Sequence, residues 1–72
     1  MNQEKIGKFI AECRKKQKLT QTQLAQKLGV SDKSVSKWEN AKCMPDLSLF
    51  KPLCQELHIS INELLEGQQL EN

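Results

Sequence analysis

Proline and glycine are scarce in this sequence, with two prolines and three glycines among 72 residues. Because apolar residues also recur along most of the chain, the composition excludes a disordered or collagen-like protein. No apolar run approaches the ~20 residues that a membrane-spanning helix needs, and the first residues, MNQEKIGK, are not a signal peptide. The sequence therefore predicts one globular domain over residues 1–72, in the cytoplasm and away from membranes.

Cysteine and histidine are equally sparse. The three cysteines, Cys13, Cys43 and Cys54, include no C-x-x-C pair, and any disulfide scheme leaves one unpaired, so we expect free thiols. Cys43 falls in a predicted loop and is the candidate for a reactive thiol. The single histidine, His58, has no partners at metal-binding spacing, so no metal and no cofactor are expected. No Ser/His/Asp set or carboxylate pair indicates an enzyme.

Charge is distributed unevenly, although the formal net charge is only +2. Residues 1–42 contain ten Lys or Arg side chains and four acidic ones, a net charge of +6, whereas residues 43–72 contain one Lys and five acidic side chains, a net charge of −4. A basic surface that faces a polyanion, with an acidic far side, would explain this asymmetry. A mixed and solvated surface would explain it as well.

The spacing of apolar residues predicts five helices and no strand, which is an all-α fold. The first helix, over about residues 5–16, has apolar residues at the i, i+3, i+4 and i+7 positions that are typical of one buried face. These residues are Ile6, Phe9, Ile10 and Cys13. A capping box of Thr20 and Gln23 begins the second helix. Gly29 ends it, because glycine adopts the left-handed backbone conformation at little cost.

The third helix is predicted to begin after its cap Ser31 and to end near Asn40. Pro45 prevents helix at the residue before it, and Asp46 can cap the fourth helix, which places Pro52 in the first turn or at a kink. The apolar face of that helix contains Leu49, Phe50, Leu53, Cys54 and Leu57.

The fifth helix is short. It begins at a second capping box, formed by Ser60 and Glu63, and ends at Gly67. Its apolar residues are Ile61, Leu64 and Leu65. The tail over residues 68–72 is predicted to be frayed.

The third helix contributes little to a core, and its composition indicates another use. Val35 and Trp38, three residues apart, anchor the helix along one narrow stripe. Lys33 and Lys37 lie one turn apart on the other side, with the small Ser34 beside them. Two helices joined by a short turn that contains glycine form a helix-turn-helix, here over residues 21–40. A slim, donor-rich face of this kind fits a DNA major groove, which is about 12 Å wide.

This combination resembles the phage repressor and Cro-like helix-turn-helix family, also called the Xre family. The stretch LTQTQLAQKLGVSDKSVSKWENAK carries the likeness through a glutamine that opens the second helix, then L-A-x-x-L-G, a cap and V-S-K-W-E-N. The flanks IGKFIAECRKKQKLTQ and PLCQELHISINELLEG fit the same domain, so the resemblance covers residues 6–67. It implies a compact five-helix fold like that of the lambda repressor.

The resemblance also implies roles for residues at matching positions. The residues that read base edges would be Ser31, Asp32, Lys33, Ser34 and Lys37. The residues that hold phosphates would be Gln21, Gln26, Asn40 and Lys42. Of these, Gln21 would use both its backbone N–H and its side chain at a helix N-terminus. Arg14 and Glu39 would form a partly buried ion pair that braces the first helix against the third.

Two positions depart from the family pattern. Ala41 stands where the family usually has glycine, so the third helix would run slightly longer or Asn40 would adopt the left-handed conformation. Asp32 places an acid at the DNA-facing tip of the third helix, where it could accept from cytosine N4 or serve only at the helix start.

The function implied by the resemblance is sequence-specific binding to double-stranded DNA by a prokaryotic or phage transcriptional regulator, a repressor associated with the nucleoid. A homodimer would bind a palindromic operator, with its contact in the fifth-helix region at Leu64, Leu65 and Leu70. Two alternatives stay open. The chain could be a protein-interaction module, such as an antitoxin or a regulator's partner, or the DNA-binding head of a longer ligand-sensing regulator.

Overall fold

The computed structural model describes residues 2–70, which contain five α-helices, one short 3-10 helix and no strand. The elements in chain order are α1 (Gln3–Lys16), α2 (Gln21–Leu28), α3 (Asp32–Glu39), η1 (Leu47–Leu49), α4 (Phe50–Leu57) and α5 (Ile61–Glu66). The predicted all-α fold with five helices is confirmed. No helix in this range is both long and apolar enough to cross a membrane.

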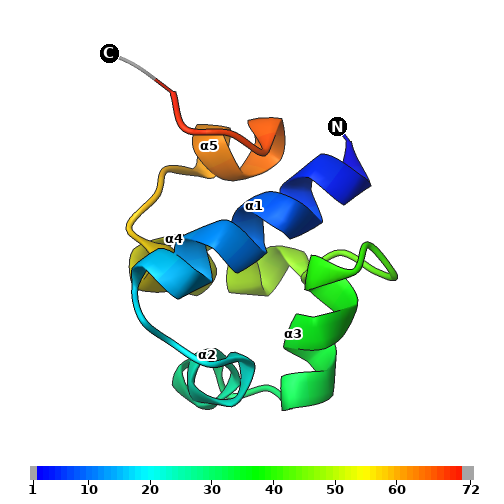
Figure 1. Cartoon of the computed structure of the whole chain (residues 1–72), viewed down its shortest axis with the longest axis vertical. Coiled ribbons are helices and arrows are strands. Elements are labelled where there is room, and N and C mark those ends of the chain that lie inside the picture. The colour runs from blue at the N-terminus through cyan, green and yellow to red at the C-terminus, as the bar shows by residue number, and fades with distance from the viewer. Residues whose placement is uncertain (1, 71–72) are drawn as a thin grey trace.

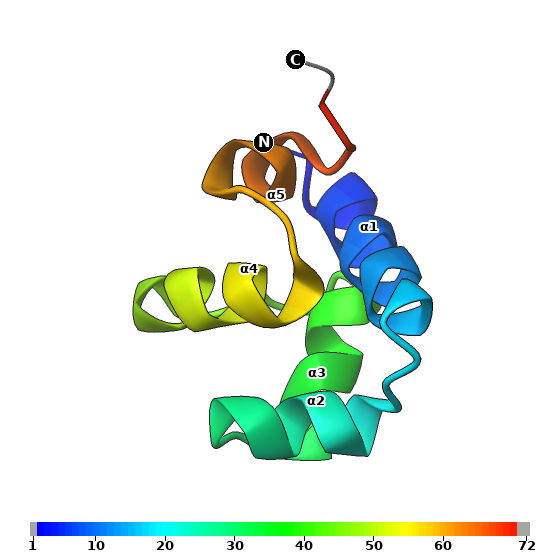
Figure 2. The same cartoon turned by 90° about the vertical axis from the view of Figure 1, so that its left-hand side faces the viewer.

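The helices pack around α1, which contacts α3, α4 and α5. In Figure 1, α5 lies beside the start of α1 at one end of the molecule, while α2 and α3 lie at the opposite end. Figure 2, turned by 90°, shows α2 lying across the far end of α3, against which it packs. The helix-turn-helix pair is therefore one end of the molecule, held by α1 and α4.

The core is built from one stripe of each helix. Its buried apolar side chains are Ile6, Phe9, Ile10, Cys13, Leu24, Ala25, Val35, Trp38, Leu53, Cys54, Leu57 and Leu64. Val35 and Trp38 are among them, so the predicted anchor of the third helix is confirmed. Leu64 is 0% exposed, so its predicted part in a dimer contact is wrong, because the α5 side chain fills this chain's own core.

The helices begin where polar side chains accept their first backbone N–H groups. The predicted capping boxes at Thr20 and Ser60 are both present. The first helix begins at Gln3, earlier than predicted, because the Asn2 side chain accepts a hydrogen bond from the Lys5 N–H at 3.0 Å. Asp46 caps the short η1 rather than α4, through the N–H of Ser48 at 3.0 Å.

All five α-helices end in the same way. A residue with positive φ follows each helix: Lys18, Gly29, Ala41, His58 and Gly67. The N–H of the next residue then donates to a carbonyl five residues earlier, in the Leu19–Arg14, Val30–Ala25, Lys42–Lys37, Ile59–Cys54 and Gln68–Glu63 pairs. This pattern is the Schellman motif. The stops at Gly29 and Gly67 are confirmed, and the other three helices use residues with a Cβ at the same position.

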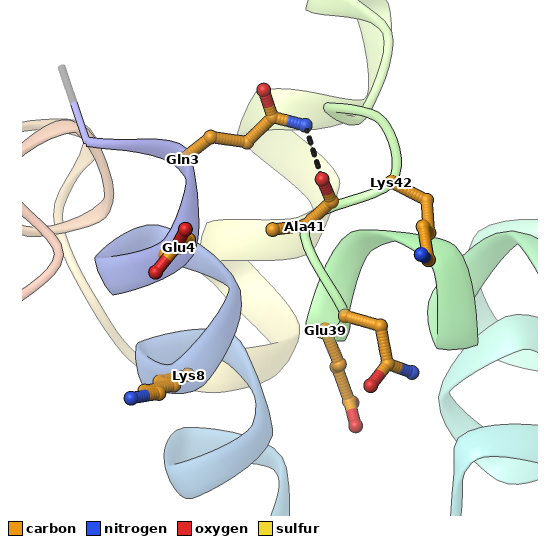
Figure 3. Close-up of a pocket in the computed structure, with 7 residues that line it drawn as sticks. Gln3, Glu4, Lys8, Glu39, Ala41 and Lys42 are labelled. Carbon is orange, nitrogen blue, oxygen red and sulfur yellow. Dashed lines mark hydrogen bonds between the residues drawn. The ribbon is translucent and has the colours of Figure 1, made fainter.

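The end of α3 corrects both expectations for this region. The helix does not run on, since it ends at Glu39, and Asn40 has a φ of −97°. Ala41 itself takes the left-handed conformation, with a φ of 58°. It is held there because its N–H donates to the Trp38 carbonyl at 3.2 Å and its own carbonyl accepts from the Gln3 side chain at 3.0 Å (Figure 3). The Schellman bonds outweigh the preference for glycine.

The remaining predictions concern Pro52 and the tail. Pro52 is the third residue of α4, in the first turn, where its missing N–H matters little. Residues 68–70 are not helical, and two of them are hydrogen-bonded: Gln68 Oε1 accepts from Lys5 Nζ at 2.8 Å, and the Leu70 N–H donates to Glu63 at 3.0 Å. The other residues of the predicted frayed tail, 71 and 72, lie outside the described residues.

Candidate nucleic-acid interface

The outer face of α3 carries most of the side chains predicted to read bases. Asp32, Lys33 and Lys37 are exposed, and Ser34 is half-buried between this face and the core. The two lysines are one helical turn apart, so their ammonium groups can reach neighbouring acceptors. The buried Val35 and Trp38 hold the opposite side of the helix, which leaves this face free for a partner.

The start of α3 is fixed by two hydroxyls. Ser31 is the N-cap, and its Oγ accepts from the Ser34 N–H at 3.2 Å. The two Oγ atoms also lie 3.2 Å apart, within hydrogen-bonding distance of each other. Both hydroxyls therefore hold the helix tip and keep remaining lone pairs or a proton for an outside partner. Asp32 is the first residue of the helix, where a negative charge is stabilised by the helix dipole.

The four side chains predicted to hold phosphates flank this helix on two sides. Gln26 is exposed on α2, and Asn40 and Lys42 are exposed just after α3. The Asn40 side-chain amide donates to the Ser36 carbonyl at 2.8 Å, which fixes its direction. Gln21, the first residue of α2, is half-buried.

Arg14 and Glu39 meet below the interface. Arg14 Nε lies 2.6 Å from Glu39 Oε2, and Arg14 Nη2 donates to Glu39 Oε1 at 3.0 Å. The remaining nitrogen, Nη1, donates to the Leu19 carbonyl at 2.8 Å, just before the cap of α2. One arginine of α1 thereby holds the end of α3 and the start of α2. The bidentate geometry is the strong form of this pair.

The Gln21 side chain joins the same cluster, a contact that sequence analysis missed. Its Nε2 donates to Glu39 Oε1 at 3.0 Å, so Glu39 accepts from side chains of α1 and α2 together. Eighteen residues separate the two partners. A glutamine at the first position of a helix gives no local sign of which distant carboxylate it will meet.

A hollow of about 550 Å³ lies beside the end of α3, and Figure 3 shows the side chains around it. It is lined by Gln3, Glu4, Lys8, Glu39, Asn40, Ala41 and Lys42. Lys8 of α1 and Lys42 of the loop after α3 stand on its two sides. Sequence analysis missed the lining residues Gln3 and Lys8, because only the packing of α1 against α3 brings them next to the predicted phosphate contacts.

The thiols and the histidine lie away from this face or outside any ligand set. Cys13 and Cys54 are buried, and burial raises the pKa of both thiols, whereas Cys43 is exposed. His58 is exposed at the end of α4. Among residues 2–70, no group of three or more His, Cys, Asp or Glu side chains is placed to hold a metal ion.

The family described as helix-turn-helix matches residues 10–64, and the chain belongs to this family. The chain is 38% identical over 61 residues to the HTH-type transcriptional activator BcrR of Enterococcus faecalis, covering 85% of this chain and 30% of that protein. It is 31% identical over 67 residues to the antitoxin PezA of Streptococcus pneumoniae, covering 93% of this chain and 42% of that protein.

A solved structure is also similar. The crystal structure of the c2 repressor of Salmonella phage P22, in complex with a synthetic operator, superposes with a TM-score of 0.82 and 33% identity. The match covers 88% of this chain and 96% of that one. The resemblance to phage repressor-like proteins is thereby confirmed. The chain spans 30% and 42% of the lengths of BcrR and PezA.

Proposed function

We propose that this protein is a transcriptional regulator, a repressor, that binds double-stranded DNA in a sequence-specific way. The observation that carries the proposal is the outer face of α3, where exposed lysines stand on a helix whose other side is anchored by buried Val35 and Trp38. The likeness to the P22 c2 repressor, solved with a synthetic operator, supports it at a TM-score of 0.82. The binding unit would be residues 1–72, with the helix-turn-helix over 21–40, in a prokaryotic cytoplasm.

In this proposal, α3 lies in the major groove. Lys33 and Lys37 donate to guanine O6 or N7, and Asp32 accepts from cytosine N4. Ser31 and Ser34, whose hydroxyls fix the helix tip, contact base edges at its end. Gln21, Gln26, Asn40 and Lys42 hold phosphates on both sides of the groove.

The chain would act as a homodimer on a palindromic operator, with two recognition helices about 34 Å apart in successive major grooves. A single module of this size buries too little DNA surface to bind tightly alone. In the fifth-helix region, the apolar side chains open to a partner are Ile61 and Leu70, 39% and 40% exposed, together with the half-buried Leu65.

The test begins with selection of a preferred duplex from random DNA, followed by titrations of this duplex and a scrambled one at the same salt concentration. Lys37→Ala should relax the preference at one base pair, because it removes a base contact. Gln21→Ala should weaken binding to both duplexes alike, because a phosphate contact carries no sequence information. Equal affinity of the unaltered protein for both duplexes would refute sequence-specific binding.

A second candidate is a protein-interaction module, and the similarity to the antitoxin PezA, 31% identical, is the observation that favours it. Its partner would meet the acidic half of the chain after residue 42. Salt separates the two candidates: DNA affinity should fall steeply between low and moderate ionic strength, since counterions are released, whereas an apolar protein contact should change little.

A further inference from the structure

The first turn of α2 is prepared for an anion by its own sequence. The capping box occupies the backbone N–H of Gln23, which donates to Thr20 Oγ1 at 3.0 Å. The backbone N–H groups of Gln21 and Thr22 precede it and have no earlier helical turn to accept them. They point toward the helix N-terminus, where a phosphate is favoured. The side chain of Gln21 is the remaining donor at this point.

The Gln21 side-chain amide has its direction set by Glu39. An amide nitrogen has two hydrogens, and one of those on Nε2 is taken by Glu39 Oε1 at 3.0 Å. A rotation of the amide by half a turn would bring its oxygen against the Glu39 carboxylate, which is acceptor-only. The carboxylate therefore favours one of two orientations that are nearly equal in shape.

Glu39 is itself unable to turn away. Its two oxygens accept from Arg14 Nε at 2.6 Å and from Arg14 Nη2 at 3.0 Å, and its side chain is 6% exposed. Arg14 also holds the Leu19 carbonyl at 2.8 Å, so the start of α2 is fixed by the same guanidinium. The amide of Gln21 is thus registered to the end of α3, the helix proposed to read bases.

We propose that Glu39 is a positioning residue for DNA binding: it orients the Gln21 amide so that the second hydrogen on Nε2 donates to a backbone phosphate. This inference rests on the proposed function and adds a role for Glu39 beyond its ion pair with Arg14. Glu39 does not touch the DNA. It acts by excluding the orientation of Gln21 that would present an oxygen to the phosphate.

The test is a double-mutant cycle with Glu39→Gln and Gln21→Ala, measured as duplex affinity at one salt concentration. In Glu39→Gln the new side chain can accept or donate, so it no longer selects one orientation of Gln21. We expect this variant to bind selected and scrambled duplexes about three- to tenfold more weakly, as for loss of one hydrogen bond. In the Gln21→Ala background, the same change should have no further effect.

Two controls separate positioning from other causes. Glu66→Gln removes the same charge from exposed Glu66 on α5, at the end of the molecule away from α2 and α3, and measures the effect of charge alone (Figure 1). Arg14→Met combined with Glu39→Gln removes the ion pair without leaving a lone buried charge, and keeps the test available if Glu39→Gln alone unfolds. In this double variant, the loss should again vanish when Gln21 is replaced by alanine.

The outcomes are distinct. If the unaltered protein binds DNA and Glu39→Gln binds equally well, the positioning role is refuted while the proposed function stands. If the Glu39→Gln loss persists undiminished in the Gln21→Ala background, Glu39 acts through the fold and the positioning role is again refuted. If the unaltered protein binds neither duplex, the proposed function itself fails.

Discussion

Arg14 and Glu39 lie 25 residues apart in sequence and form a two-pronged ion pair, with Nε and Oε2 at 2.6 Å. Their side chains are 11% and 6% exposed, so water screens the pair poorly. The pair joins α1 to the end of α3 and, through the Leu19 carbonyl, to the start of α2. Both charges depend on each other for solvation inside the protein.

Glu39→Ala should lower the free energy of unfolding by about 3–5 kcal/mol, because it leaves the Arg14 guanidinium buried without a counter-charge. Urea unfolding followed by circular dichroism measures the change. The matched control is Glu66→Ala, at an exposed position of α5, which should stay within about 0.5 kcal/mol of the unaltered protein. A Glu39→Ala midpoint equal to that of the unaltered protein would contradict the prediction.

Gly7→Ala should destabilise the protein, although alanine is the better helix former. Gly7 lies where α1 crosses the end of α3, and an added Cβ would stand 2.5 Å from the Trp38 carbonyl oxygen and 2.9 Å from that of Glu39. Both neighbours are backbone atoms, so the helices must separate, at a cost of about 1–3 kcal/mol. Thermal unfolding checks the effect. The neighbouring exposed residue provides the control, since Lys8→Ala adds no clash; a Gly7→Ala melting temperature at or above that of Lys8→Ala would refute the close contact.

Ala41→Gly should stabilise the protein. Ala41 has a φ of 58°, a conformation that costs a residue with a Cβ about 1–2 kcal/mol, and glycine removes this strain. After the greater unfolded-state entropy of glycine is subtracted, a gain of about 0.5–1 kcal/mol remains, or a melting temperature higher by several degrees.

Gly29→Ala is the reverse experiment. No atom lies within 4 Å of a Cβ added at Gly29, so the only penalty comes from its φ of 72°. It should lose about as much stability as Ala41→Gly gains. A loss of stability in Ala41→Gly would mean that the left-handed turn after α3 is not strained.

The helix ends show how far the sequence predicts this fold. Thr20 and Ser60, with a partner three residues on, indicate capping boxes from local chemistry alone, and Gly29 and Gly67 indicate helix stops. Lys18, Ala41 and His58 adopt the same left-handed conformation, yet nothing in their chemistry favours it. Tertiary packing and the Schellman hydrogen bonds impose it on them, so sequence analysis could not locate these turns.

The candidate site divides in the same way. The spacing of Val35 and Trp38 predicted which side of α3 is buried, and therefore which side faces outward. The Arg14–Glu39 pair followed only from the family resemblance, because residues so far apart carry no periodic signal. The bond from Gln21 to Glu39 lay beyond both routes, since it depends on where the start of α2 falls against the end of α3.

Cys43 should be the one thiol that reacts quickly with a disulfide reagent in the folded protein. Cys43 is exposed in the loop after α3, whereas burial raises the pKa of Cys13 and Cys54 and lowers their thiolate fraction. A colorimetric thiol assay should give one fast equivalent in buffer and three in denaturant. Cys43→Ser should abolish the fast reaction. Rapid labelling that survives this substitution would mean that α1 or α4 opens readily.

The start of α5 should lose stabilisation in acid. The Glu63 carboxylate accepts from the Ser60 N–H at 2.8 Å and from the Leu70 N–H at 3.0 Å, and these bonds hold its pKa below the ordinary value of 4.5. A carboxyl whose pKa is lower in the folded state stabilises the fold above its unfolded pKa, and this contribution disappears as the pH falls through the folded pKa.

Glu63→Gln keeps the shape of the capping box but cannot titrate. The difference in unfolding free energy between the unaltered protein and Glu63→Gln should therefore shrink from about pH 6 to about pH 3, as the carboxyl is protonated in both states. Urea unfolding across this range measures the difference, and Glu66→Gln on the same helix corrects for the loss of one carboxylate. A difference that stays constant or widens toward low pH would show that the bonds from Ser60 and Leu70 do not favour the ionised carboxylate.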